Sequence, residues 1–161
     1  KQFANAYCGT YHYLYAPLFV KDKDMREKLM KDPYIGDTLS LAKRSTIILT
    51  SIGSINSTIS NSAWNAYIDS YTQFELQSNG VVGHIGGHFY DINGKKADVE
   101  LNKNIIGIEL EDFLKVPNVI CVAGSEEKAK ALLGAIRGGY IKTLITDDTA
   151  ALKILELNDT M

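Results

Sequence analysis

The later part of the chain alternates apolar runs with stretches of helical spacing. The apolar runs are "IIGIEL" (105–110), "NVICVAG" (118–124) and "IKTLIT" (141–146). The helical stretches that follow them are "EDFLKVP" (111–117), "SEEKAKALLGAIRGG" (125–139) and "DDTAALKILEL" (147–157). Continuous apolar strands between helices are typical of a parallel sheet that helices cover on both faces. The pattern predicts an α/β domain with a doubly wound parallel sheet.

The earlier part of the chain adds two helices and a strand to this pattern. "KDKDMREKLMKD" (21–32) has the mixed charges of a solvated helix face. Asp32 followed by Pro33 predicts a second helix through 34–44, because Asp caps free N–H groups and Pro fits the first helical turn. "TIILTSIG" (46–53) is rich in β-branched residues and stops at a glycine, so it predicts a buried strand.

Three further segments have local signals of their own. "TYHYLYAP" (10–17) alternates aromatic residues and ends in proline, which predicts a short strand. Residues 54–61 are rich in Ser and Asn and predict a loop, whereas residues 63–80 predict helical pieces. Asn93 and Gly94 stand between two short runs, and this pair predicts a two-residue β-hairpin turn.

Composition narrows the class of protein. With 161 residues, 45% of them hydrophobic and 22% charged, the chain is predicted to fold as one domain over residues 1–161. The net charge of −2 gives no indication of the positively charged surface that binds nucleic acid. No apolar run approaches the ~20 residues of a membrane helix, so we expect no membrane partner. Cys8 and Cys121 are far apart and lack metal-ligand spacing, which fits reduced thiols in a cytoplasmic protein.

The loops that follow the strands are the expected place for a ligand, because open parallel sheets bind ligands at the carboxyl ends of their strands. The candidate loops are 51–56, 124–128 and 146–149. Ser125 is placed as a helix N-cap, and Lys128 lies in the first turn, where the helix dipole disfavours a cation. A bound anion such as a phosphate would supply a partner for Lys128. The alternative is a solvent-facing lysine paired with a nearby acid.

The other candidate loops carry weaker signals. "SIGSINS" (51–57) offers a glycine and hydroxyl groups that suit an anion or a sugar, but it is neither a P-loop nor a dinucleotide fingerprint. "DDTAA" (147–151) places acids at a helix start, where N-capping is the expected role. No G-x-S-x-G motif occurs, and neither cysteine has basic neighbours. We therefore predict no catalytic residue and no cofactor.

His84 and His88 lie four residues apart in "GVVGHIGGHFYDINGK" (80–95). A helical metal pair is disfavoured, because Gly86 and Gly87 each cost about 1 kcal/mol in a helix interior. No third ligand is clustered with them, so we predict no metal site. In an extended segment both rings would share one face and could line one pocket. In that case ligand binding would change between about pH 5.5 and 7.5. The alternative is two satisfied polar side chains beside a sheet.

Several segments together resemble one protein family. They are "TSIGSI", "GVVGHIGGHFYDINGK" and a run at 105–156 with the motifs I-x-L-E-D-x-x-x-x-P, A-G-x-E-x-K-A and L-x-T-D-x-x-x-A. In combination they resemble the C-terminal sugar-binding effector domain of SorC/DeoR-type bacterial transcriptional regulators. The resemblance covers nearly the whole chain and is densest from Gly80 to Glu156.

The resemblance implies a fold and an architecture. Effector domains of this family are similar to sugar-phosphate isomerases of the ribose-5-phosphate and glucosamine-6-phosphate type, and here a β-hairpin excursion would interrupt the doubly wound sheet. Family members carry an N-terminal helix-turn-helix that this chain lacks. Operator DNA is therefore expected as a partner only through that absent domain. The first strand-loop unit of the effector domain, with its glycine-rich loop, also has no counterpart here.

The resemblance further implies a ligand and its site. The family's effector is typically a phosphorylated sugar that shifts oligomerisation, so we expect a homo-oligomer, either a dimer or a tetramer. The lysine of the A-G-x-E-x-K-A motif matches Lys128. The expected effector-binding residues are Gly53, Ser54, Gly83, His84, His88, Gly124, Ser125 and Lys128.

His84 and His88 are also where the sequence departs from the family pattern. The family usually has an acid at the first position and often an arginine at the second, so its sugar contacts cannot be copied unchanged. The expected function is effector sensing and oligomerisation without catalysis. The alternatives are an isomerase-like enzyme and a purely structural oligomerisation module, which fold similarity alone does not separate.

Overall fold

The computed structural model of the chain describes residues 1–55, 64 and 67–160. The strands are β1 (Ile47–Thr50), β2 (Gly53–Ser54), β3 (Val81–Ile85), β4 (His88–Asp91), β5 (Asn118–Val122) and β6 (Thr143–Ile145). The helices are α1 (Gln2–Ala6), α2 (Lys23–Met30), α3 (Pro33–Lys43), α4 (Ser70–Ser78), α5 (Glu100–Lys103), α6 (Leu110–Lys115), the 3₁₀ helix η1 (Glu126–Lys128), α7 (Ala129–Arg137) and α8 (Asp148–Thr160).

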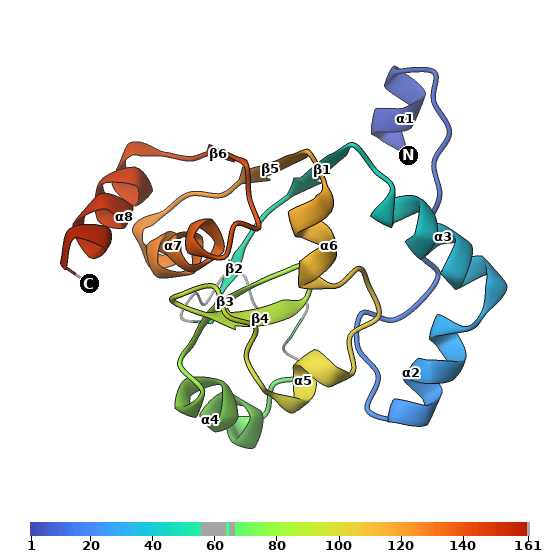
Figure 1. Ribbon diagram of the computed structural model, residues 1–161, viewed down its shortest axis with the longest axis horizontal. Helices are drawn as coiled ribbons and strands as arrows, with labels where there is room; N and C mark the ends of the chain where they lie inside the picture. Colours follow the sequence, from blue (N-terminus) through green and yellow to red (C-terminus); the bar gives the residue numbers. More distant parts are fainter. Residues whose placement is uncertain (56–63, 65–66, 161) are drawn as a thin grey trace.

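The strands form two sheets. β1, β5 and β6 form a parallel sheet in the order β1-β5-β6, and β2, β3 and β4 form an antiparallel sheet. The parallel sheet crosses the upper part of the molecule, with the antiparallel sheet below it (Figure 1). Because the three parallel strands run in one direction, their carboxyl ends meet at one edge. The predicted α/β class and parallel sheet are confirmed.

The predicted β-hairpin forms, but its turn is not the predicted one. Gly86 and Gly87 connect β3 to β4 with φ values of 56° and 91°. Two consecutive residues at positive φ match the twist of a two-residue hairpin, and glycine adopts this conformation without a steric penalty. The predicted turn at Asn93 and Gly94 also forms, with Gly94 at φ 78°, but only an isolated bridge between Tyr90 and Lys96 closes it, so no second pair of strands develops there.

The main core lies between the parallel sheet, α6, α7 and the hairpin. α7 contributes a face of buried small and apolar residues, which are Ala129, Ala131, Leu132, Leu133, Gly134 and Ala135. Val119 and Cys121 of β5 and Tyr90 of β4 are fully buried against this core. The hydroxyl of Tyr90 donates to the carbonyl oxygen of Ala131 at 3.0 Å. This bond and the packing hold the hairpin against α7.

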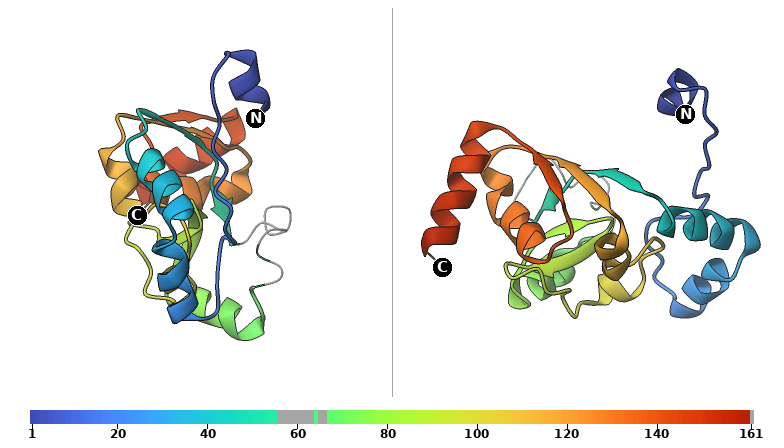
Figure 2. Two further views of the ribbon diagram at one scale, coloured as in Figure 1. Left: turned by 90° about the vertical axis from the view of Figure 1, so that its right-hand side faces the viewer. Right: turned by 45° about the horizontal axis from the view of Figure 1, so that its top comes forward.

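The two helices predicted near the N-terminus are confirmed. The side chains of Asp22 and Asp32 accept backbone N–H bonds at the starts of α2 and α3, and Pro33 is the first residue of α3. Val20, Ile35 and Leu39 of this region form a small core with Ile106, which lies between α5 and α6. α1 projects away from the rest of the molecule in all three views (Figures 1 and 2).

Two predicted strands do not form. Residues 10–17 belong to no strand, and their alternating tyrosines stay exposed, because a strand needs a neighbour to complete its hydrogen-bond ladder. In 105–110, Ile105 makes an isolated bridge with Phe19. The capping box of Glu109 starts α6 directly afterwards, so the chain becomes helical before a strand can extend. Both predictions are wrong.

One face of the parallel sheet carries exposed apolar side chains. They are Ile47 (58% exposed), Leu49 (65%), Val122 (48%) and Ile145 (55%). The alternate positions, such as Val119 and Cys121, face the core. The prediction that the strand in 46–53 is buried is therefore wrong for β1, where Ile47 and Leu49 stay exposed. β1 is an edge strand of this sheet.

The remaining predictions concern the middle of the chain. The predicted loop at 54–61 lies mostly outside the described residues, as does part of 63–80. Within the described part, α4 confirms a helical piece, and Asn79 follows it as the C-cap, with Gly80 at φ 65°. The described helices lack the length and apolar character that crossing a membrane requires.

Candidate functional site

The loops after the parallel strands come together at one edge of the sheet. The loop after β1 leads into β2, which lies beside η1 in the loop after β5. The loop after β6 contributes Asp147, which hydrogen-bonds to the loop after β5. The three candidate loops are therefore connected, as expected for the carboxyl edge of a parallel sheet.

Asp147 anchors this edge. Its Oδ2 accepts the backbone N–H of Ser125 at 2.7 Å, and its Oδ1 accepts the Thr149 hydroxyl at 2.6 Å. Oδ1 also accepts the N–H of Ala150 at 2.8 Å, so the predicted capping role of the acids is confirmed. These bonds, with Thr149 the largest contributor, lower the pKa of Asp147 to about 2. Gly124 allows this approach, because a Cβ there would collide with Oδ2 of Asp147.

Ser125 adopts a backbone conformation that is rare outside glycine. Its φ is 82° and its ψ is 144°. Such a conformation costs on the order of 1–3 kcal/mol for a residue with a Cβ. Ser125 occupies the predicted N-cap position, but its side chain makes no capping hydrogen bond. The bond from its N–H to Asp147 helps to hold the loop in this shape instead.

Gly53 and His84 form a close pair across β2 and β3. A Cβ on Gly53 would overlap the imidazole ring of His84, so this position requires glycine for the ring to lie where it does. The next pair in the register, Ser54 and Gly83, is buried beside α7. Gly53 and Ser54, two of the expected site residues, thus contact the β3–β4 hairpin directly.

The ring of His84 lies in an aromatic environment. Its centroid is 5.5 Å from that of Trp64 and 5.3 Å from that of Phe89. Its Nε2 is buried without a hydrogen-bond partner in the described part of the chain. Burial first, and the charge of Lys128 second, lower the pKa of His84 to about 4. The ring is therefore neutral near pH 7, and His84 does not titrate in the window expected from the sequence.

Lys128 lies where η1 meets α7. Its side chain is partly buried, and no acidic side chain in 1–55, 64 or 67–160 pairs with it. Burial raises the pKa of Cys121 to about 11, and the charge of Lys128 opposes this rise, as it adds to the lowering of the His84 pKa, so the ammonium group lies within electrostatic range of both side chains. Within the described residues, the alternative of a lysine paired with a nearby acid finds no support.

His88 lies on the other side of the hairpin from His84. The two-residue turn pairs Ile85 with His88 and His84 with Phe89. Side chains alternate between faces along a strand, so His84 and His88 point in opposite directions. The prediction that both rings share a face is wrong, because the chain reverses between them.

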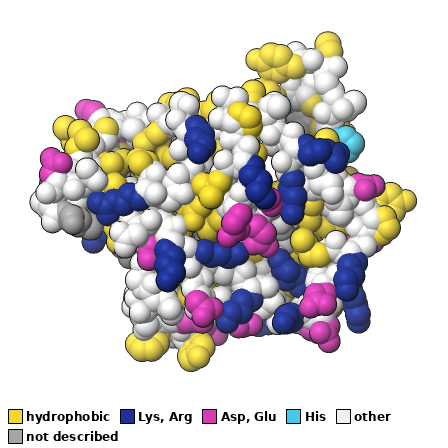
Figure 3. Space-filling view, in the orientation of Figure 1, with side chains coloured by type: hydrophobic (Ala, Val, Ile, Leu, Met, Phe, Trp, Pro, Cys, Tyr) yellow, Lys and Arg dark blue, Asp and Glu magenta, His cyan; other side chains and the backbone are white. Residues whose placement is uncertain are grey.

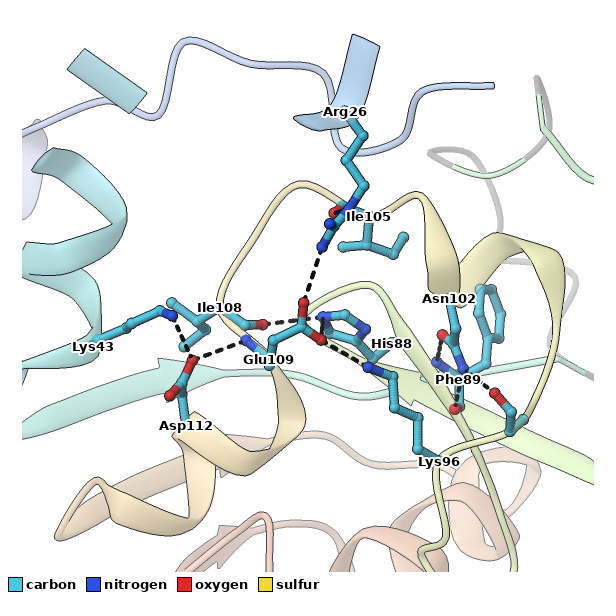
Figure 4. A network of polar contacts seen from close by, with 11 residues as sticks. Arg26, Lys43, His88, Phe89, Lys96, Asn102, Ile105, Ile108, Glu109 and Asp112 are labelled. Atoms are coloured by element: carbon cyan, nitrogen blue, oxygen red, sulfur yellow. Dashed lines mark hydrogen bonds and ion pairs between the residues drawn. The ribbon is translucent and has the colours of Figure 1, made fainter. Parts of the chain in front are cut away.

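His88 belongs to a separate polar network (Figure 4). It is fully buried, and its Nε2 donates to the carbonyl oxygen of Ile108 at 3.1 Å. Glu109 is 3.7 Å away and also binds Lys96 at 2.7 Å and Arg26 at 3.0 Å. Burial raises the pKa of Glu109, but the hydrogen bond and charge of Lys96 and the charge of Arg26 outweigh burial and hold that pKa below its usual value. Burial lowers the pKa of His88, so the ring acts as a neutral donor.

Three residues that shape the site and its support were not found from the sequence. Asp147 was identified as a helix cap but not as the anchor of the neighbouring loop. Glu109 gave no signal, since its partners come from distant segments. Asn102 is buried and exchanges two hydrogen bonds with the backbone of Phe89, at 2.7 and 2.9 Å, and only the fold reveals this contact.

The structure brings most of the expected site residues together. These are Gly53, Ser54, Gly83, His84, Gly124, Ser125 and Lys128. It does not bring His88 to them. No group of three or more His, Cys, Asp or Glu in the described ranges could hold a metal ion. Basic and acidic side chains are interleaved on the face shown in Figure 3, in keeping with the small net charge.

The chain is similar to known proteins in sequence and in fold. Residues 1–156 match the family Sugar-bind, described as "Putative sugar-binding domain". The transcriptional regulator LsrR of Enterobacter sp. (strain 638) is 31% identical over 144 residues, which are 88% of this chain and 45% of LsrR. The chain spans about half the length of the curated relatives it matches.

Solved structures share the fold. A domain with the same description, from a transcriptional repressor of Vibrio fischeri, has a TM-score of 0.89 and 32% identity over 98% of this chain and 63% of its own. The full-length sorbitol operon regulator SorC of Klebsiella pneumoniae has a TM-score of 0.86 and 28% identity over 92% of this chain and 48% of its own. These similarities confirm the doubly wound α/β architecture. By its match over residues 1–156, the chain belongs to the family of sugar-binding domains that LsrR- and SorC-like transcriptional regulators contain.

Proposed function

We propose that the chain is the effector-sensing and oligomerising part of a sugar-responsive transcriptional regulator. In this proposal a phosphorylated sugar binds at the carboxyl edge of the parallel sheet and changes operator binding by a helix-turn-helix elsewhere in the protein. Residues 1–161 form the effector-binding part, the protein acts in the cytoplasm, and the assembly is a homo-oligomer. Neither a cofactor nor catalysis is involved.

The observation that carries the proposal is the environment of Lys128. Its ammonium group has no acidic partner among the described residues and lies within electrostatic range of His84, whose Nε2 also lacks a partner there. A phosphate oxygen would supply the partner for Lys128, and a sugar hydroxyl could supply one for His84. We assign the phosphate to Lys128 and the loop at Gly124 and Ser125, and we place the sugar near Gly53 and His84.

Ser54 and Gly83 complete the proposed site as its wall beside α7. We leave His88 out, because it is fully buried on the opposite face of the hairpin and its Nε2 already donates to Ile108. A ligand beside His84 could reach His88 only through the hairpin itself.

The test is ligand-induced thermal stabilisation. We expect hexose 6-phosphates to raise the melting temperature of the chain more than the matching unphosphorylated sugars do. Lys128→Ala should weaken binding by at least about tenfold, because a charge-assisted hydrogen bond is lost. Lys130→Ala, which removes an exposed lysine two residues away, is the matched control and should bind normally. Equal binding by the Lys128 variant and the wild type would contradict the assignment.

A second measurement separates the proposal from an isomerase-like enzyme. An enzyme would convert the bound sugar phosphate, whereas a sensor would return it unchanged. Incubation of the chain with each stabilising sugar phosphate, followed by chromatography of the sugars, measures this directly. Turnover above the background rate that disappears in Lys128→Ala would favour the enzyme.

A further inference from the structure

The strongest unassigned feature is a cavity between the hairpin and α4. It has a volume of about 160 Å³ and is lined by apolar side chains that include Ile55, Leu76 and Phe89. His84 also lines it, so the cavity adjoins the proposed effector site. A volume of roughly 150 Å³ holds one benzene molecule, so this cavity, with its mixed apolar and polar lining, has room for a single six-membered ring or a short carbon chain.

The polar groups of the cavity are all uncharged. Gln73 and Gln77, one turn apart on α4, contribute amides, and His84 contributes its imidazole. No Asp, Glu, Lys or Arg lines the cavity in the described part of the chain, and the sequence of 56–66 contains none of them. Because the ring of His84 is neutral near pH 7, the cavity carries no net charge there.

A charged ligand group would be poorly accommodated in such a cavity. An ammonium or a carboxylate loses its hydration on entry and finds no opposite charge to compensate it. A hydroxyl group, in contrast, can donate to or accept from an amide or a neutral imidazole. His84 lines the cavity and its ring is neutral near pH 7, so the imidazole can form such a bond with a ligand hydroxyl.

We propose that this cavity receives the uncharged, hydroxyl-bearing end of the effector and discriminates against amino sugars and sugar acids, with His84 as the residue that sets this specificity. The inference rests on the proposed function, because it concerns the far end of a molecule whose phosphate binds Lys128. His84 touches both regions: it lines the cavity and is close enough to Lys128 to sense its charge.

Three probes with the same phosphate test the inference. Glucose 6-phosphate is neutral at its far end, glucosamine 6-phosphate carries an ammonium, and 6-phosphogluconate carries a carboxylate. Calorimetric titration near pH 7 should show glucose 6-phosphate binding about tenfold or more tightly than either charged probe, because a desolvated unpaired charge is costly. His84→Asp should reverse the order for glucosamine 6-phosphate, whereas His12→Asp, at an exposed position, should leave the order unchanged.

The outcomes distinguish this inference from the function on which it rests. Equal binding of the three probes, or a wild-type preference for a charged one, would overturn the inference and leave effector sensing intact. Binding of none of them would contradict the proposed function and the inference with it. If His84→Asp does not fold, the wild-type protein still decides the matter. The ring nitrogens of His84 should shift in a two-bond ¹H–¹⁵N spectrum when glucose 6-phosphate is added, and an unshifted His84 signal with bound ligand would refute the assignment.

Discussion

At the scale of single residues, the site contains a strained backbone position, a position that only glycine can occupy, and a buried polar atom without a hydrogen-bond partner in the described residues. Ser125 holds a positive φ that glycine would adopt freely, and Gly53 leaves the space that the His84 ring fills. His84 is buried without a hydrogen-bond partner in the described residues. These features cost free energy, and they persist because the surrounding packing and hydrogen bonds hold them in place. Features of this kind tend to cluster at functional sites.

Ser125→Gly should stabilise the protein. Relief of the positive-φ strain outweighs the entropy that an added glycine costs, so we expect the free energy of unfolding to rise by about 1 kcal/mol. Urea denaturation measures the change. Ser40→Gly, at an exposed position in α3, is the control and should destabilise by roughly 0.5 kcal/mol. A loss of stability in both variants would mean that Ser125 is not strained.

The protein should become less stable as the pH is lowered, because the fold buries His84 in its neutral form. The pKa is about 4 in the folded chain and about 6.5 when unfolded, so between these values the unfolded state binds more protons. The contribution of neutral His84 to the free energy of unfolding is complete above about pH 6.5 and is lost as the pH falls toward 4. At pH 5 the free energy of unfolding should be about 2 kcal/mol lower than at neutral pH. His88 acts in the same direction, since burial lowers its pKa as well.

Urea denaturation at about pH 7.5 and about pH 5 tests this titration. His84→Asn should lose a large part of the pH dependence, because asparagine does not titrate. His12→Asn is the control at an exposed histidine and should keep the wild-type dependence. If the His84 variant and the wild type lose the same stability on acidification, the ring is not held neutral by the fold.

At the scale of elements, Glu109 joins parts of the chain that are distant in sequence. It precedes α6 as its N-cap and pairs with Arg26 of α2 and Lys96 near the hairpin. Arg26 also donates from Nε to the carbonyl oxygen of Ile105 at 2.8 Å. These contacts attach α2 to the body of the molecule beside the buried ring of His88 (Figure 4).

Glu109→Gln should therefore weaken the attachment of α2. The amide keeps the shape of the side chain but loses the charge that two cations share, and we expect about 1–2 kcal/mol of destabilisation. Urea denaturation measures the loss, and faster amide hydrogen exchange in α2 would locate it. Asp98→Asn, which removes the exposed partner of Lys103, is the control and should cost less than about 0.5 kcal/mol. Equal losses in the two variants would contradict the structural role of Glu109.

The elements also show what the sequence can predict. Helices with caps, such as α2 and α3, and strands that are continuous apolar runs, such as β5, follow from local patterns. The strand predicted at 10–17 fails because a ladder depends on a neighbour that no local pattern reveals. The opposite orientation of His84 and His88 depends on which glycines form the turn. Buried atoms without hydrogen-bond partners, and ion pairs between distant segments, arise only when the chain folds. The loops of the site could therefore be predicted from the sequence, but the partners of their side chains could not.

At the scale of the whole molecule, the described residues cover only one face of the parallel sheet. Its inner face packs on α7, whereas Ile47, Leu49, Val122 and Ile145 are about half exposed or more on the other. Contiguous exposed apolar surface of this kind marks interaction sites in soluble proteins. It supports the proposed oligomerisation, and a second copy of this chain is the occupant we expect in solution.

Leu49→Lys together with Val122→Lys should abolish self-association of the chain. Lysines on this face would have to lose their hydration in a contact between two apolar sheets, which is costly, whereas in the monomer they remain in water. Sedimentation velocity at increasing concentration should show the wild type associating and the double variant remaining monomeric. The control is Leu152→Lys with Leu155→Lys, two equally exposed leucines on α8, which should associate like the wild type. Association that survives in the first variant, or is lost in the control, would place the contact on another surface.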